Sequence, residues 1–114
     1  MNDCIFCKIA AGEIPSNFLY EDDDLFAIND ISPQAPVHIL IITKKHIPSI
    51  LDVTNNEAPL ISKVHMLATR LAARYKLDQE GFRIVNNSLK AGGQEVPHLH
   101  FHMLGGRQMQ WPPG

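Results

Sequence analysis

The sequence lacks several features that mark common classes of protein. Its 114 residues contain no apolar run close to the roughly 20 residues that a membrane-spanning helix needs. The N-terminal sequence MNDCIFCK has neither the basic nor the apolar segment of a secretory signal peptide, so a cytoplasmic location is expected. The net charge is −2 and no basic run occurs, which argues against binding of long nucleic acid.

Cysteine is also scarce, with two residues in the chain. Cys4 and Cys7 form a Cys-x-x-Cys pair, which in a reducing compartment indicates metal binding or redox chemistry more than a structural disulfide. A thioredoxin-like pair follows a strand, and no strand is predicted before Cys4. A metal site and two buried, unreactive thiols remain as alternatives.

Turn and capping signals divide the chain into short elements around one long helix. Asp3 is placed to cap a short helix that ends at Gly12. Residues 54–57 fit a capping box that opens a helix reaching Tyr75, with apolar residues at helical spacing. Strands are predicted over residues 18–20, 25–28, 38–43, 82–86 and 98–104.

These elements predict an α+β fold in a single domain over residues 1–114. The fold is a five-stranded, mostly antiparallel sheet with one long and one short helix. The near-continuous apolar run of residues 38–43 predicts a strand that is buried on both faces. Both helices are expected on one face of the sheet, which leaves the other face open.

Three of the six histidines, His98, His100 and His102, alternate along the last predicted strand. Alternate strand residues share one face, so the three imidazoles should lie together while the apolar residues between them point into a core. Three ligands for one metal ion are disfavoured, because the first and last Cα atoms are roughly 13 Å apart and zinc–nitrogen bonds are about 2 Å long. Histidine is well suited to chemistry near neutral pH.

The run HLHFHML resembles the signature of the histidine triad (HIT) family, hydrolases and transferases that act on the α-phosphate of nucleotides. The segments CIFCKI, EIP, AINDISPQAPVHILIITKKHI, AGGQ and LGGRQMQWPPG resemble one branch, the histidine triad nucleotide-binding proteins, and occur in the same order. The resemblance covers nearly the whole chain. It implies a HIT-like fold that is paired as a homodimer.

The resemblance also implies roles for the histidines. His100, the middle one, is expected to attack phosphorus and form a covalent nucleotidyl-histidine. Its attacking nitrogen must be unprotonated, so the opposite N–H needs an acceptor such as a backbone carbonyl. His102 is expected to donate to a phosphate oxygen or the leaving group. His38 resembles the family's fourth active-site histidine, although the residues alone favour a strand-end histidine near solvent.

The remaining site residues follow from the same resemblance. An apolar slot for the base would be formed by Phe6, Ile9, Ile14 and Ile28, and the ribose would be held by Asp30 and Ile31. The phosphate would be faced by Asn87, Gly93, Gln94 and Glu95, and Trp111 would cover the partner's site. From the residues alone, ordinary core positions and turn residues explain most of them as well. Glu95 stands where close relatives carry a serine that faces the phosphate. A carboxylate there would be repelled by the phosphate unless it points away or is protonated.

Some family members hold zinc with a Cys-x-x-Cys pair and two histidines. The matching residues here are Cys4, Cys7, His46 and His98. Two thiolates and two imidazoles complete a tetrahedral site, so such a zinc would be structural, and His98 would brace the strand that carries His100. Other relatives lack the cysteines and function without metal, so zinc stays one of two alternatives.

The resulting expectation is a hydrolase that cleaves the P–N bond of purine nucleoside 5′-phosphoramidates, or acyl-nucleotides, through His100. One alternative is a dinucleoside polyphosphate hydrolase or nucleotidyl transferase of the same family. Another is a non-catalytic protein that binds nucleotide or carries zinc. The expected partners are a purine nucleotide such as AMP or GMP and a second copy of the chain, with the tail near the neighbouring site.

Overall fold

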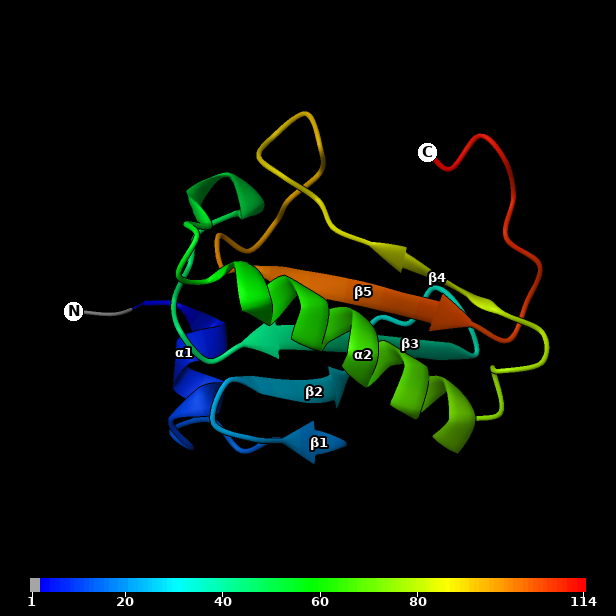
Figure 1. The fold of residues 1–114 in the computed structure, drawn as a ribbon, viewed down its shortest axis with the longest axis horizontal. Helices are drawn as coiled ribbons and strands as arrows, with labels where there is room; N and C mark the ends of the chain where they lie inside the picture. Colours follow the sequence, from blue (N-terminus) through cyan, green and yellow to red (C-terminus); the bar gives the residue numbers. More distant parts are fainter. Residues whose placement is uncertain (1–2) are drawn as a thin grey trace.

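Five strands form one sheet in which every neighbouring pair is antiparallel, in the order β1-β2-β3-β5-β4 (Figure 1). The computed structural model describes residues 3–114. The strands are β1 (Tyr20–Glu21), β2 (Leu25–Asn29), β3 (Val37–Thr43), β4 (Phe82–Val85) and β5 (His100–Gly105). The predicted α+β fold with a five-stranded antiparallel sheet is therefore confirmed.

The centre of the sheet is the pair β3 and β5, whose register places the histidines. Leu40 lies opposite His102, and Ile42 lies opposite His100. Residues that face each other across an antiparallel pair point to the same side of the sheet. The two histidines therefore share one face with an apolar row of β3.

The long helix α2 (Ala58–Arg74) crosses one face of this sheet (Figure 1). Its buried face packs on alternate residues of β2, β3 and β5. The resulting core contains Leu25, Ala27, Ile39, Ile41, Ile47, Val64, Leu67, Ala68, Leu71, Ala72, Leu77, Leu99, Phe101 and Met103. The predicted inward direction of the apolar residues between the histidines is confirmed.

The short helix α1 (Ile5–Ala10) packs on the opposite face, so the expectation that both helices share one face is wrong. The physical reason is that β2 and β3 are apolar at successive positions, and both of their faces need a cover. The second core contains Phe6, Ile9, Phe26, Ile28, Leu40 and Ile42. The histidine face is thus partly covered and not open.

Element boundaries differ from the prediction at several ends. α2 begins at Ala58, because residues 54–57 form a separate turn in which the Glu57 carboxylate accepts from the Thr54 N–H and hydroxyl, both at 2.9 Å. The Cys4 thiol, not Asp3, caps α1 by accepting from the Cys7 N–H. β5 begins at His100, and His98 precedes it.

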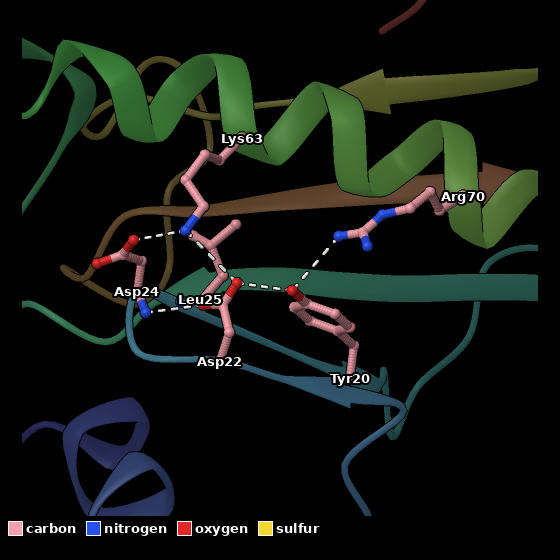
Figure 2. Close-up of polar contacts among 6 residues, drawn as sticks. All are labelled: Tyr20, Asp22, Asp24, Leu25, Lys63 and Arg70. Carbon is pink, nitrogen blue, oxygen red and sulfur yellow. Dashed lines mark hydrogen bonds and ion pairs between the residues drawn. The ribbon is translucent and has the colours of Figure 1, made fainter.

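A polar cluster ties the turn between β1 and β2 to α2 (Figure 2). The Asp22 carboxylate accepts from the backbone N–H groups of Asp24 and Leu25 at 2.7 and 2.8 Å and from the Tyr20 hydroxyl at 2.6 Å. Lys63 of α2 forms ion pairs with Asp22 and Asp24 at 3.4 and 2.5 Å. Burial opposes ionisation, but these hydrogen bonds outweigh it and hold the pKa of Asp22 well below its usual range. The acidic run is thus a structural turn.

None of the helices within residues 3–114, α1, α2 and the short 3-10 helix η1 (Ile50–Asp52), combines the length and the apolar character that a membrane span would need.

Candidate functional site

A cavity of about 380 Å³ opens on the α1 face of the sheet, above β5. This volume suits a small organic ligand. The residues that line it come from α1, the end of β2 and the segment after it, β3, the loop after β4, and β5: Ile5, Phe6, Ile9, Ile28, Asn29, Asp30, Ile31, Ser32, Leu40, Asn87, Gly93, Glu95, Val96, His100 and His102. The structure therefore brings two of the three triad histidines into one cavity.

His100 is held in one orientation and one tautomer. Its Nδ1 lies 2.6 Å from the carbonyl oxygen of His98. A carbonyl only accepts, so Nδ1 carries the proton and the neutral ring leaves Nε2 with a free lone pair. The Phe6 ring packs edge-on against His100 with ring centroids 5.1 Å apart. The acceptor expected for this histidine is thus supplied by its own strand.

A chain of hydrogen bonds determines the tautomers of His38 and His102. The backbone N–H of Gln34 donates to His38 Nδ1 at 3.0 Å, so His38 carries its proton on Nε2. His38 Nε2 lies 2.9 Å from His102 Nδ1 and 3.4 Å from an Asp30 carboxylate oxygen. His102 Nδ1 then accepts, and the neutral His102 ring carries its proton on Nε2. His38 is buried behind His102 and does not line the cavity.

The electrostatics of the pair keep His102 neutral. Burial, and then the neighbouring His100 and His38, lower the pKa of His102 from its ordinary value of 6.5, and Asp30 opposes them. A neutral His102 is what the hydrogen-bond chain requires, because a proton on Nδ1 would face the N–H of His38.

His98 lies outside the cavity and belongs to a second cluster. Its side chain is 0% exposed, and its Nε2 donates to the Thr43 carbonyl at 2.6 Å. Its Nδ1 therefore carries a lone pair, which faces Cys4 Sγ at 3.1 Å, His46 Nδ1 at 3.1 Å and Cys7 Sγ at 3.5 Å. Cys7 Sγ and His46 Nδ1 are 3.3 Å apart.

These four atoms fit a tetrahedral zinc site. All lie within 4.8 Å of one another, and zinc bonds of about 2.0–2.3 Å place tetrahedral ligand atoms about 3.3–3.8 Å apart. The Thr43 carbonyl fixes the ligating tautomer of His98 in the way that metal-binding histidines are usually oriented. Burial raises the pKa of the Cys4 thiol in the metal-free protein, and a bound dication would displace that proton.

The apolar wall of the cavity contains most of the residues predicted to hold a base. Phe6, Ile9 and Ile28 line it, whereas Ile14 packs at the edge of the second core and does not reach the cavity. Ile31 lies at the rim with 98% of its surface exposed. An apolar ligand group would bury this residue. Asp30 lies beside it, and its other oxygen accepts from the Ser32 N–H at 2.7 Å.

The loop after β4 borders the cavity through Asn87, Gly93 and Glu95. Gly93 has a φ of +80°, and a Cβ on Gly92 would lie 2.4 Å from the Ser88 carbonyl oxygen, so both glycines are needed for this loop shape. Gln94 is turned away from the cavity. Its side chain accepts from Leu89 N–H and donates to the carbonyls of Pro48 and Val96, which makes it a brace for the loop.

Trp111 does not line the cavity of its own chain and is 82% exposed. Sequence reasoning missed Gln34, whose backbone N–H sets the tautomer of His38. It acts through the main chain, so no side-chain motif marks it. The two prolines around it, in the segment PQAP, were the available sign of a defined turn. Arg107 Nε donates to the Gln34 carbonyl at 3.0 Å and secures the same turn.

Comparisons with known proteins agree with this geometry. The family model described as the HIT domain matches residues 11–109. An uncharacterized HIT-like protein of Synechococcus elongatus is 47% identical over 112 residues, which are 98% of this chain and 97% of that protein.

Solved structures extend the agreement to the fold. A HIT family hydrolase from Legionella pneumophila Philadelphia 1 superposes with a TM-score of 0.95 at 51% identity, covering 98% of this chain and 100% of the other. A histidine triad protein from Clostridium difficile gives a TM-score of 0.92 at 48% identity, with 96% of each chain covered. The resemblance inferred from the HLHFHML run is confirmed at the level of the family, and this chain belongs to the HIT domain family.

Proposed function

We propose that the protein is a nucleotide hydrolase that cleaves the P–N bond of purine nucleoside 5′-phosphoramidates, or the corresponding bond of acyl-nucleotides. The observation that carries the proposal is the pair of opposite tautomers in one cavity. His100 presents a lone pair on Nε2 and His102 presents an N–H on Nε2. One ring is prepared to attack and its neighbour, with ring centroids 5.2 Å away, to donate a hydrogen bond to the leaving group.

In the first step, His100 Nε2 forms a bond to the α-phosphorus and the bond from phosphorus to the leaving nitrogen breaks. His102 Nε2–H donates a hydrogen bond to that nitrogen, which takes a proton from solvent and leaves as a neutral amine. His102 stays neutral, because loss of its only ring proton would leave an imidazolate. The His100 ring gains positive character while its Nδ1–H remains on the His98 carbonyl at 2.6 Å. A hydrogen bond to a charged group is stronger than a neutral one, so this contact stabilises the intermediate.

In the second step, water attacks the phosphorus and releases a proton to solvent, while the bond from phosphorus to His100 Nε2 breaks and its electron pair returns to that nitrogen. His100 regains its neutral starting tautomer, and His102 keeps its own throughout. His38 acts as a positioning residue, because it holds His102 Nδ1 as an acceptor throughout. The family resemblance that assigned His100, His102 and His38 to these roles is supported by their hydrogen bonds.

The cavity supports the nucleotide assignment. Phe6, Ile9 and Ile28 offer an apolar wall to a base, and the Asp30 carboxylate at the same cavity is an acceptor for ribose hydroxyls. Asn87 and Gly93 also line this cavity and are proposed to face the phosphate.

The cluster of Cys4, Cys7, His46 and His98 is proposed to hold one structural zinc ion. When bound, zinc would cross-link α1 to the segments before β5 and after β3. With four protein ligands it would have no open position for chemistry. The His98 carbonyl keeps its place without the metal, because the His98 ring is also bonded to Thr43.

A homodimer is proposed on the free edge of β4. The sheet ends at β4, and its four residues are each half-buried in the single chain. Met66 on α2 exposes 64% of its surface beyond the same core. A second copy paired along β4 would extend the sheet. Burial of Met66 and docking of the exposed Trp111 at the neighbouring site are proposed to accompany this pairing. Light scattering at micromolar concentration tests this: a dimer is expected, and a monomer contradicts it.

The decisive experiment for the activity compares adenosine 5′-phosphoramidate with diadenosine polyphosphates in one assay with purified protein. Faster turnover of the phosphoramidate supports the proposal. Faster turnover of the polyphosphates would assign the chain to the dinucleoside polyphosphate hydrolases. Nucleotide binding without turnover of either compound would make the protein a non-catalytic binder.

A further inference from the structure

The charged side chains that line the main cavity are all acidic. Within residues 3–114, its lining includes two carboxylates, Asp30 and Glu95, and neither lysine nor arginine. Asp30 is engaged, through Ser32 on one oxygen and near His38 on the other. The Glu95 side chain has no hydrogen bond or ion pair with any residue that the structure describes. A site for an anionic phosphate therefore carries an unpaired negative charge.

Glu95 lies where this cavity opens to the surface. It also lines two shallower hollows: one with Cys4, His46 and Val96, and one with Lys90 and Gly93. Both hollows thus share lining residues with the main cavity. In the proposed binding mode, the apolar wall of α1 and β2 contacts the base. The leaving group beyond the phosphate would then extend through this opening, past Glu95.

Resting on the proposed function, we infer that Glu95 selects nucleotides whose leaving group carries a positive charge. An exposed carboxylate a few ångströms from the leaving group attracts a cation and repels an anion by an amount that changes rates about 3- to 10-fold. Leaving groups that are themselves phosphorylated carry negative charge and are disfavoured for the same reason. The monoester product also carries more negative charge than the substrate, so Glu95 favours its release.

Two other groups face the shared hollows and could offset Glu95. His46 lines the first hollow and Lys90 the second. Lys90 forms no ion pair with Glu95 among the described residues, so its ammonium lies beyond ion-pair distance and neutralises the carboxylate only in part. Lys90→Gln is therefore expected to strengthen the preference for a cation.

The test uses two substrates of equal shape: adenosine 5′-phosphoramidates of 2-(trimethylammonio)ethylamine and of 3,3-dimethylbutylamine. The substituents differ in charge, which also alters intrinsic reactivity, so the decisive quantity is how the ratio of their kcat/KM values changes between proteins. In Glu95→Gln, the ratio of cationic to neutral substrate should fall about 3- to 10-fold from the wild-type value. The wild-type ratio should also shrink as salt is raised.

Glu80→Gln is the matched control, because Glu80 is exposed and lies outside all three hollows. It should leave the ratio unchanged. An equal ratio in wild type and Glu95→Gln would overturn the inference, as would an equal drop in Glu80→Gln, which would show a long-range effect of net charge.

A binding measurement separates this inference from the proposed function. The AMP esters of choline and of 3,3-dimethylbutanol carry the same two groups on a phosphodiester, and their Kd values are measured by calorimetry. Failure of every phosphoramidate to turn over would refute the proposed hydrolase. The ratio of the two Kd values, compared between wild type and Glu95→Gln, would still decide whether Glu95 selects positive charge.

Discussion

The first two histidines of the run, His98 and His100, show how one residue type serves two kinds of site. At the start of the run, the neutral ring of His98 donates to Thr43 and turns its free nitrogen toward two thiols and His46. Two residues later, His100 donates to the His98 carbonyl and its unprotonated nitrogen faces an open cavity. The two sites differ in which backbone carbonyl accepts from the protonated ring nitrogen, and in whether the unprotonated nitrogen is reached by solvent. The first site is closed, and the second is free to react.

The largest expected effect comes from removing the free nitrogen of the open site. His100→Ala should lower kcat by about 10⁴-fold or more while changing nucleotide affinity little, because its role is covalent attack and not ground-state binding. Rapid quench with a substrate labelled in the nucleotide should trap a phosphorus–nitrogen adduct in wild type. A variant that turns over at the normal rate, with no adduct in wild type, would refute the mechanism.

Acidification should silence the open site next. Because burial and its histidine neighbours lower the pKa of His102 below 6.5, the acid limb of kcat/KM that this ring causes should have its midpoint below pH 6.5. The free energy of unfolding should change in the same direction. As the pH falls, His102 is protonated in the unfolded chain before it is protonated in the folded chain, so its contribution is complete above pH 6.5 and is lost as the pH falls toward the pKa of the folded state. Rates and melting temperatures from pH 5 to 8 check both. An acid limb with its midpoint above pH 6.5 would contradict the assignment.

The closed site should affect stability and hardly affect chemistry. One zinc per chain is expected in protein purified without chelator. Substituting Cys4 and Cys7 together by serine should lower Tm by about 5–10 °C, with kcat changed less than about threefold because Thr43 still holds His98. Lys8→Ala on the same helix is the control for a surface change. If zinc is present and its removal from folded protein stops the reaction, the division between the two sites fails.

The smallest effect is expected from the tail. Deleting residues 110–114 removes the exposed Trp111 without disturbing either core, so Tm should shift little. If the tail reaches the partner's cavity, relative rates across a series of amine leaving groups should change by a few-fold. Rates that keep the same ratios would show that the tail plays no part in selecting the leaving group.

Much of this arrangement could be predicted from local patterns. The alternation in HLHFHML placed His100 and His102 on one face, and the apolar run of β3 predicted its burial on both sides. The position of α1 could not be predicted, because the apolar pattern of a six-residue helix does not indicate which face of the sheet it packs against. The capping box predicted at residues 54–57 is present in half. Glu57 reaches back to the Thr54 N–H as predicted, but the Thr54 hydroxyl donates to the Glu57 carboxylate and the helix begins at Ala58.

By itself, the sequence determined the family, the sheet and the residues that carry the chemistry, because these depend on short-range periodicity and spacing. Only the tertiary structure decided which ring nitrogen each histidine exposes. For His98 and His102 the partners are remote: Thr43 is 55 positions from His98, and His38 is 64 positions from His102. The partner of His100 is close in sequence, the His98 carbonyl two residues away, but packing decides that the opposite nitrogen meets the cavity. A tautomer is set by the atom that meets the other nitrogen, and packing of β3 against β5 and of α1 on the sheet supplies those atoms.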